Sequence, residues 1–280
     1  MTDRPDVPSA NEDALDARVE LGAMLYTLVD PHRGFETAYN RWYERDHFYA
    51  GCMIGPWLFA GGRWVATRRL KNLRFPASAT VASPVDAGSY LATYWVHRHH
   101  EAECFSWSTA QVHRLYNGGR GFDERSHAHT ALYTHQQDHY RDADPVPVEL
   151  ALDHRYRGLV SVHVDRAEGV KHPVLDEWFT ATGREILLGA DSPVAIVSMW
   201  RPIIPRLPEG EQAPMPLGSG PGTPQRSMFL AFIECDPEEC WDRIHAFAEA
   251  VNASGLATVN LAAGFIPTII GTDIYSDELW

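Results

Sequence analysis

The segment Arg41-Trp42-Tyr43-Glu44-Arg45-Asp46-His47-Phe48 in the first half of the chain has a weaker copy in the second half, Glu177-Trp178-Phe179-Thr180-Ala181-Thr182-Gly183-Arg184. Both copies keep a tryptophan followed by another aromatic residue. The Asp46-His47 pair, however, is replaced by Thr182-Gly183. Because an internal repeat reports a structural unit used twice, this segment predicts a duplicated fold in which only the first unit keeps a titratable pair.

Hydrophobic periodicity predicts the same order of elements in both halves. For the first half we expect strand 21–29, helix 34–49, strand 57–67, strand 90–97, helix 101–117 and strand 127–135. For the second half we expect strand 159–165, helix 172–188, strand 193–200, strand 227–234, helix 236–255 and strand 256–270. A loop follows the second strand of each half: the loop 75–88 is rich in alanine, proline and serine, and the longer loop 202–224 is rich in proline and glycine.

This order is the β-α-β-β-α-β pattern of a ferredoxin-like unit. We therefore predict an α+β fold in which two tandem units pair their sheets and form an intrachain, pseudo-dimeric α/β barrel. The expected organisation is a flexible N-terminal arm (1–17), a first unit (18–140), a linker (141–157) and a second unit (158–280). The alternative is that two α+β domains share an order of elements by chance.

Composition limits the classes of function. The 280 residues carry a net charge of −13, which disfavours binding to nucleic acid or to anionic lipid. Four cysteines without a CxxC pair predict free thiols in a reducing compartment. The N-terminus has no signal-peptide pattern, and no apolar run reaches the ~18 residues of a membrane span. We expect a soluble, cytoplasmic protein.

The stretch 39–47 resembles the helix signature of the EthD-like group of dimeric α/β-barrel proteins, in which a Trp-aromatic pair precedes a histidine by four or five residues. That group includes cofactor-independent cyclases, isomerases, oxygenases and decarboxylases of aromatic or polyketide-like compounds, heme-handling proteins, and members without known activity. The resemblance implies a pocket between sheet and helices that binds a small molecule. This chain departs from the pattern in being a fused pair whose second copy lacks the histidine.

His47 is the first candidate for catalysis, because histidine is the usual acid or base near neutral pH. Tyr43 lies one helical turn before it and can offer a phenolic hydrogen bond. Asp46 points about 100° away around the helix and could orient Arg63, which could itself stabilise an anionic oxygen. The alternative is that His47 is a partly buried histidine whose ring is satisfied by a backbone carbonyl.

Histidines and aromatic residues supply the remaining candidates. Eight of the fourteen histidines lie between His97 and His139, and alternation predicts that His97 and His99 share one strand face and that His127, His129 and His135 share another. They could form a metal site or supply a heme ligand, or they could simply face solvent. The residues expected to bind a flat apolar ligand are Tyr39, Trp42, Trp64, Trp95, His97 and His129.

We therefore predict an enzyme that performs cofactor-independent acid/base chemistry, of the cyclase, isomerase, dehydratase or decarboxylase type. Its substrate would be a hydrophobic aromatic or polyketide-like small molecule. Its catalytic residues would be His47, Tyr43, Asp46 and Arg63, with no metal and no cofactor. The alternatives are a small-molecule binding protein without catalysis and a histidine-ligated metal or heme protein. Intrachain pairing of the units allows a monomer, and a homodimer is the other possibility.

Overall fold

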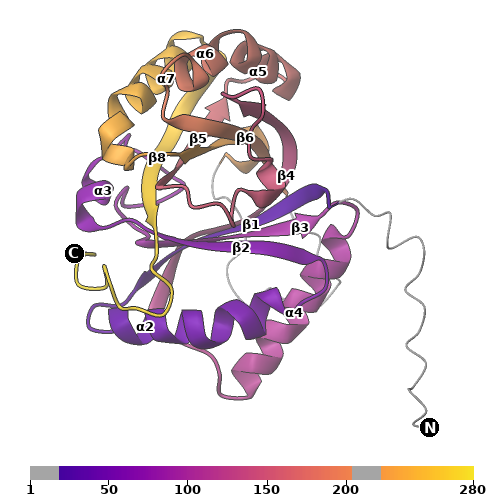
Figure 1. Cartoon of the computed structure of the whole chain (residues 1–280), viewed down its shortest axis with the longest axis vertical. Coiled ribbons are helices and arrows are strands. Elements are labelled where there is room, and N and C mark those ends of the chain that lie inside the picture. Colours follow the sequence, from indigo (N-terminus) through magenta and orange to yellow (C-terminus); the bar gives the residue numbers. More distant parts are fainter. Residues whose placement is uncertain (1–18, 204–221) are drawn as a thin grey trace.

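The computed structural model describes residues 19–203 and 222–280. Its sheet is a closed barrel of eight antiparallel pairings in the order β1-β3-β2-β8-β5-β7-β6-β4 (Figure 1). The strands are β1 (Leu21–Pro31), β2 (Leu58–Val65), β3 (Tyr90–His97), β4 (Arg125–Tyr140), β5 (Gly158–Arg166), β6 (Val194–Ile203), β7 (Arg226–Ile233) and β8 (Ala257–Pro267). Each half contributes four adjacent strands in the order 4-1-3-2, which confirms the predicted fold class.

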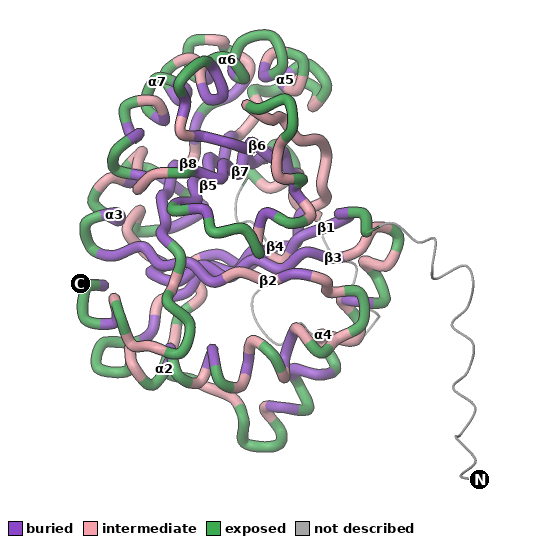
Figure 2. Tube along the Cα trace, in the orientation of Figure 1, coloured by how far each residue is buried: buried purple, intermediate pink, exposed green. Residues whose placement is uncertain are grey.

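The helices are α2 (Glu36–Trp42), α3 (Arg68–Asn72), α4 (Glu101–Asn117), α5 (His172–Trp178), α6 (Arg184–Leu188) and α7 (Trp241–Ala253). Helices α2 and α4 lie on one side of the barrel and α5, α6 and α7 on the other, whereas the short α3 of the first half lies beside β8 (Figure 1). The described residues contain no helix long and apolar enough to cross a membrane. Figure 2 shows that most strands are buried along most of their length, because the barrel interior covers one face and the helices cover the other, whereas β4 and β2 also contain half-buried stretches.

The first helix of each half changes from α to π geometry directly after its tryptophan. In the first half the π-helical segment is Tyr43–Met53, and in the second half it is Phe179–Gly183. The change therefore occurs at the equivalent dipeptide in both halves. A π segment inserts an extra residue per turn and shifts the faces that follow it, and such segments are frequent at functional sites.

The two seams between the halves differ in length. On one side β4 pairs with β6 from Leu132↔Ile203 to Tyr140↔Ile196. On the other side β2 pairs with β8 only at Trp64↔Pro267 and Val65↔Ile266. After Pro267 the chain leaves the sheet and runs to α2, where the Asn40 side chain donates to the Thr272 carbonyl at 2.7 Å (Figure 1). The expected bounds of the units remain a prediction, but residues 268–280 lie against the first half.

The barrel interior contains polar as well as apolar side chains. Tyr26 shares a hydrogen bond of 3.0 Å with Ser161 of the other half. The Tyr133 hydroxyl lies 2.9 Å from His129 Nε2 and 3.5 Å from His163 Nδ1. Burial lowers the pKa of His129 to about 3 and holds that of His163 well below its ordinary value. Both imidazoles are therefore neutral at pH 7 and act as uncharged parts of the core.

Several predicted details are wrong. The helix expected at 34–49 begins at Glu36 and continues in π geometry to Met53. The strand expected at 127–135 runs from Arg125 to Tyr140. A bulge in it puts His127 opposite Val29 and His129 opposite Leu28, so these two histidines face opposite sides of the sheet. Strand β3 ends at His97, and His99 adopts a left-handed turn conformation (φ 70°) in place of the shared strand face. The N-terminal arm and most of loop 202–224 lie outside the described residues.

The neutral histidines of the barrel should make the protein sensitive to acid. A histidine whose folded-state pKa is depressed contributes stability above its unfolded pKa of about 6.5 and loses it as pH falls. At pH 5 each such histidine should cost about 2 kcal/mol relative to pH 7. Urea unfolding at the two pH values should show this loss, and His129→Gln should reduce it. His113→Gln, on the exposed side of α4, is the matched control; an equal loss in all three proteins would contradict the assignment.

Candidate functional site

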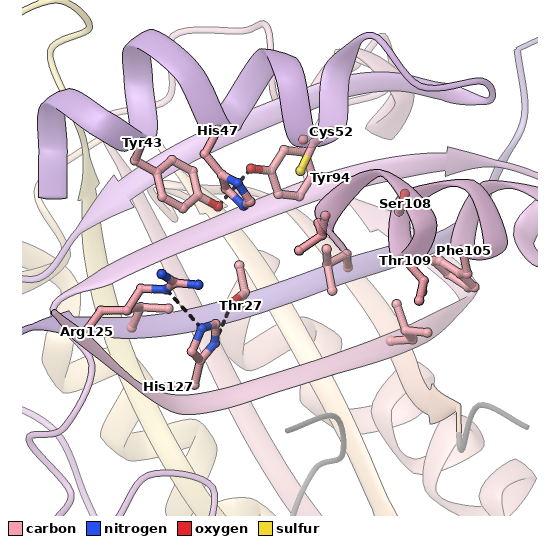
Figure 3. A pocket seen from close by; sticks show the side chains of 15 residues that line it. Thr27, Tyr43, His47, Cys52, Tyr94, Phe105, Ser108, Thr109, Arg125 and His127 are labelled. Carbon is pink, nitrogen blue, oxygen red and sulfur yellow. Dashed lines mark hydrogen bonds between the residues drawn. The ribbon is translucent and has the colours of Figure 1, made fainter. Parts of the chain in front are cut away.

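A pocket of about 80 Å³ lies between the helices of the first half and the outer face of its sheet. The π segment supplies Tyr43, His47 and Cys52, α4 supplies Ser108 and Thr109, and the strands supply residues from β1, β3 and β4 (Figure 3). The strand residues follow the alternation of side chains, because Leu25, Thr27 and Val29 all face the helices. The pocket walls are mainly apolar.

His47 points into this pocket from the π segment (Figure 3). Its ring stacks on the indole of Trp42, with ring centroids 4.6 Å apart. Gly51 allows this position, because a β-carbon there would lie 2.9 Å from His47 Nδ1. Within residues 19–203 and 222–280 no group forms a hydrogen bond with the imidazole, so the predicted alternative of a backbone carbonyl partner is not observed. Burial, together with the charge of Arg125, lowers the pKa of His47 to about 3.

Arg125 and His127 lie on β4 across the pocket from His47 (Figure 3). Arg125 Nε donates to His127 Nε2 at 3.3 Å, so this nitrogen is unprotonated. The proton is therefore on Nδ1, which lies 2.7 Å from Thr130 Oγ1. Burial and the Arg125 charge lower the pKa of His127 to about 4. The guanidinium also donates to the Tyr116 hydroxyl and lies 4.9 Å from the Trp42 ring centre. One fixed cation thus faces two neutral imidazoles.

Two phenols and a thiol form another side of the pocket. The Tyr43 and Tyr94 hydroxyls share a hydrogen bond of 2.8 Å. Burial raises the pKa of both phenols well above the ordinary value and raises the pKa of the Cys52 thiol to about 12. All three groups therefore keep their protons at neutral pH. They can donate hydrogen bonds, and Cys52 lacks the environment that activates a thiolate nucleophile.

Of the four predicted catalytic residues, the structure brings Tyr43 and His47 together and places the other two elsewhere. Asp46 lies on the outer side of the helix and binds Arg120. Arg63 is not oriented by Asp46, because its guanidinium donates to Glu44 at 3.0 Å and to Asn40 at 2.8 Å. It lies against the Tyr43 and Tyr90 rings and does not line this pocket.

The predicted ligand-binding residues are divided between the two faces of the sheet. Trp42 lies behind His47, and Tyr39 is buried next to it, with ring centroids 6.0 Å apart. Trp64 and Trp95 come from strand positions that face the barrel interior, where Trp95 stacks on Trp200. His129 also points inward, toward Tyr26. His97 ends β3 near the exposed Trp57.

Sequence reasoning missed the residues that face His47. Arg125 and His127 are two positions apart at the start of β4, so both point to the same side of the strand. The pattern Arg-x-His was visible, but the strand was expected to begin at His127. Tyr94 was also missed, although it alternates with the buried Trp95 on β3 and must therefore face the helices.

The histidines between His97 and His139 do not converge. His97 and His100 lie near Trp57, His129 is in the barrel interior, and His135 binds Asp138 at 2.9 Å. Among the described residues there is no group of three or more histidine, cysteine, aspartate or glutamate side chains that could hold a metal ion.

No family model and no curated protein matches the sequence. Solved structures do match the fold. A chlorite dismutase-like protein, TA0507, superposes with a TM-score of 0.51 at 10% identity, covering 93% of this chain and 100% of its own. An anthrone oxidase-like protein gives 0.49 at 10% identity, covering 91% and 96%. A DypB variant of Rhodococcus jostii RHA1 in complex with heme gives 0.48 at 10% identity, covering 92% and 96%.

The fold is that of the dimeric α+β barrels. At 10% identity this likeness concerns the fold alone, and neither the EthD-like group nor a duplication of the gene follows from it. The predicted alternative of a heme protein does not fit the pocket beside His47, because a space of about 80 Å³ is far too small for a porphyrin.

Replacing Arg125 should raise the pKa of His47. Without the Arg125 charge, the second-largest cause of the lowered His47 pKa is gone, while burial still favours the neutral imidazole. We expect the His47 Cε1–H resonance of the native protein to stay constant from pH 8 to pH 5. In Arg125→Gln it should begin to titrate at a higher pH than in the native protein. Arg114→Gln, on the exposed side of α4, is the matched control. A native His47 that titrates near pH 6.5 would contradict this account.

Proposed function

We propose that the protein is an enzyme that performs cofactor-independent acid/base chemistry on a hydrophobic aromatic or polyketide-like small molecule. The reaction would be of the cyclase, isomerase, dehydratase or decarboxylase type. The observation that supports this most directly is a neutral imidazole, His47, held without a hydrogen-bond partner among the described residues and facing the Arg125 cation across an apolar pocket. A free imidazole nitrogen and a fixed cation are the two groups that proton abstraction next to a carbonyl requires.

In the proposed step His47 accepts a proton from a carbon or hydroxyl group of the substrate. The electron pair moves onto the adjacent oxygen, and Arg125 stabilises the negative charge that develops there. His47 then returns the proton to a different atom, or to a leaving hydroxyl group. Tyr43 and Tyr94 keep their protons, and because one hydroxyl donates to the other, one phenolic proton remains to hold a second oxygen of the substrate. Asp46 has no part in this step, because it is bound to Arg120 on the outer surface.

The depressed pKa of His47 limits what this base can do. An imidazole whose conjugate acid has a pKa of about 3 abstracts only protons that are already acidic. An anionic oxygen bound beside Arg125 would neutralise one cause of the depression and would raise the basicity of His47. Activated substrates such as β-keto acids and phenolic ketones fit this requirement better than unactivated ones. The pocket has room for the reacting ring only, so the rest of a larger substrate would extend toward its mouth.

The same low basicity favours a second candidate function, a binding protein that uses the pocket without catalysis. In that case Trp42, which forms the wall behind His47, would supply more of the affinity than His47 itself. For the state of assembly we propose a monomer, with a homodimer as the alternative. The sheet closes within one chain, so a monomer is sufficient to complete the barrel, and a homodimer would need a further surface.

His47→Ala should lower turnover by roughly 10²–10⁴ with folding intact, because it removes the proposed base. The assay would use a panel of aromatic β-keto acids and phenolic ketones, followed by absorbance and mass spectrometry. His245→Gln, a histidine of the second half that stacks on Phe75, is the matched control and should keep full activity. Unchanged turnover in His47→Ala would overturn the assignment. Affinity that survives in His47→Ala and falls in Trp42→Ala, without turnover in either, would favour the binding protein.

For an uncharged substrate kcat/KM should stay constant between pH 5 and pH 8. The pKa of His47 is depressed in the folded protein, so the basic form is fully present above pH 5 and is lost only as pH falls toward 3. An ordinary histidine base would instead lose half its activity near pH 6.5. Initial rates measured within the pH range where the fold is stable by circular dichroism distinguish the two cases.

A further inference from the structure

After β8 the chain crosses from the second half to the first half and ends there (Figure 1). Thr268 extends the short seam by one backbone hydrogen bond of 3.1 Å to β2. Near the end of the chain, Leu279 is fully buried, and the Arg68 N–H donates to the Glu278 carbonyl at 2.6 Å. Residues 268–280, which we call the C-terminal strap, are therefore packed onto the first half although they follow the last strand of the second half.

The strap contacts the helix that carries His47 through two polar side chains, Asn40 and Glu44. These residues are four positions apart and therefore lie on neighbouring turns of the helix. Asn40 Nδ2 donates to the Thr272 carbonyl at 2.7 Å, and Glu44 Oε2 accepts from the Gly271 N–H at 2.8 Å. Gly271 has a φ of 82°, a left-handed conformation that glycine adopts without strain, so the strap can turn here and present both groups to the helix.

The same two side chains bind Arg63 of β2. Arg63 Nη1 donates to Asn40 Oδ1 at 2.8 Å and to Glu44 Oε1 at 3.0 Å. Asn40 is 3% exposed, and Glu44 and Arg63 are each 8% exposed. The helix is thus connected to the sheet and to the strap through one buried network. Removing one member of such a network leaves its partners without their hydrogen bonds, so the helix and the strap depend on each other for their positions.

A second contact holds the end of the strap. The Trp280 indole N–H donates to Glu36 Oε1 at 2.6 Å, and Glu36 is the first residue of α2. The centre of the indole ring also lies 4.3 Å from Nζ of Lys71, an α3 residue whose side chain is only 1% exposed. The strap therefore contacts α2 at its beginning as well as at its junction with the π segment.

Glu44 is adjacent in sequence to two pocket residues but does not line the pocket. Tyr43 precedes it directly, His47 follows three positions later, and both line the pocket beside Arg125. The Glu44 carboxylate instead points toward β2 and the strap. Because these side chains leave one short helical segment in different directions, the contacts of Glu44 fix the rotation of the segment about its axis. That rotation sets how far Tyr43 and His47 reach into the pocket.

We propose that the C-terminal strap, acting through Glu44, holds Tyr43 and His47 in place, and that Glu44 is a positioning residue for this site. The residues that line the pocket all belong to the first half, but a segment of the second half completes its geometry. The short seam then has a role, because side-chain contacts to the strap continue the connection beyond the pairing of β2 with β8. The proposed function enters only through the treatment of this pocket as the active site.

The test compares Glu44→Gln with Asp165→Asn in the full-length protein. Glutamine keeps the size of the side chain, but its amide cannot accept hydrogen bonds from Arg63 and from the Gly271 N–H at once. Asp165→Asn is the matched control, because it removes a charge from an ion pair of the second half in which Arg226 is fully buried. We expect hydrogen exchange of the Gly271 amide to accelerate about 10-fold or more in Glu44→Gln alone.

The decisive readout is the Cε1–H resonance of His47. In the native protein the imidazole stacks on the Trp42 indole, and the ring current of the indole shields this proton. In Glu44→Gln the resonance should move downfield, toward its position in the unfolded protein, whereas in Asp165→Asn it should not move. With a substrate that is turned over, kcat should fall about 10- to 100-fold in Glu44→Gln with little change in KM, because a displaced base slows the chemistry more than the binding.

Two results would overturn the inference. The first is a His47 resonance at its native position in folded Glu44→Gln. The second is an equal shift in Asp165→Asn, which would attribute the change to a general loss of stability. If Glu44→Gln does not fold, Asn40→Ala replaces it under the same two criteria, because this variant keeps the ion pair of Glu44 with Arg63. The resonance is measured without turnover, so an inactive native protein would contradict the proposed function and not the role of the strap.

Discussion

The pairing of β4 with β6 holds the two halves of this chain in one barrel. Nine residues of β4, Leu132–Tyr140, span this seam, whereas the opposite seam rests on Trp64 and Val65. Closing the sheet leaves few strand edges to be protected and forces the inward faces of both halves to share one core. Every functional feature follows from this closure. Successive side chains on a strand point alternately into the shared interior and toward the helices that cover the outer face of the sheet.

The sequence was sufficient to predict the architecture because its strongest signals were local and repeated. Strand alternation and the Trp-aromatic pair both indicated the same order of elements. The features that it could not supply are departures from regular periodicity. One extra residue in β4 turns His127 away from His129, and the π segment changes which residues of the first helix face the sheet. A single bulge reverses every later assignment on a strand, so site residues are harder to predict than the fold.

In the candidate site, too, some residues were predicted correctly from local sequence patterns and others were not. His47 and Tyr43 were predicted from a helical row and do face the pocket, because they precede the point at which the π geometry has accumulated a large shift. Arg63 was expected to stabilise an anionic oxygen and instead binds Glu44. Glu44 lies on the same helix as Asp46, and the spacing of the sequence alone did not show which of the two carboxylates would contact Arg63. Arg125 was overlooked because its importance depends on a contact across the pocket, about eighty positions from His47 in sequence. Contacts of this kind exist only after the sheet has formed.

In the second half, aromatic rings fill the position that corresponds to the site at His47. Gly183 occupies the position that corresponds to His47, and a β-carbon there would lie 2.8 Å from Phe179 and 3.0 Å from Phe247. The rings of Phe179, Phe229 and Phe247 pack together at centroid distances of 4.8–5.9 Å and fill the space between helix and sheet. Aromatic packing of this kind stabilises a core at the expense of a cavity. A chain that contains both halves can therefore give stability to one and leave the other with an open pocket. Introducing a histidine at Gly183 alone would not create a site, because three phenylalanine rings already occupy the space.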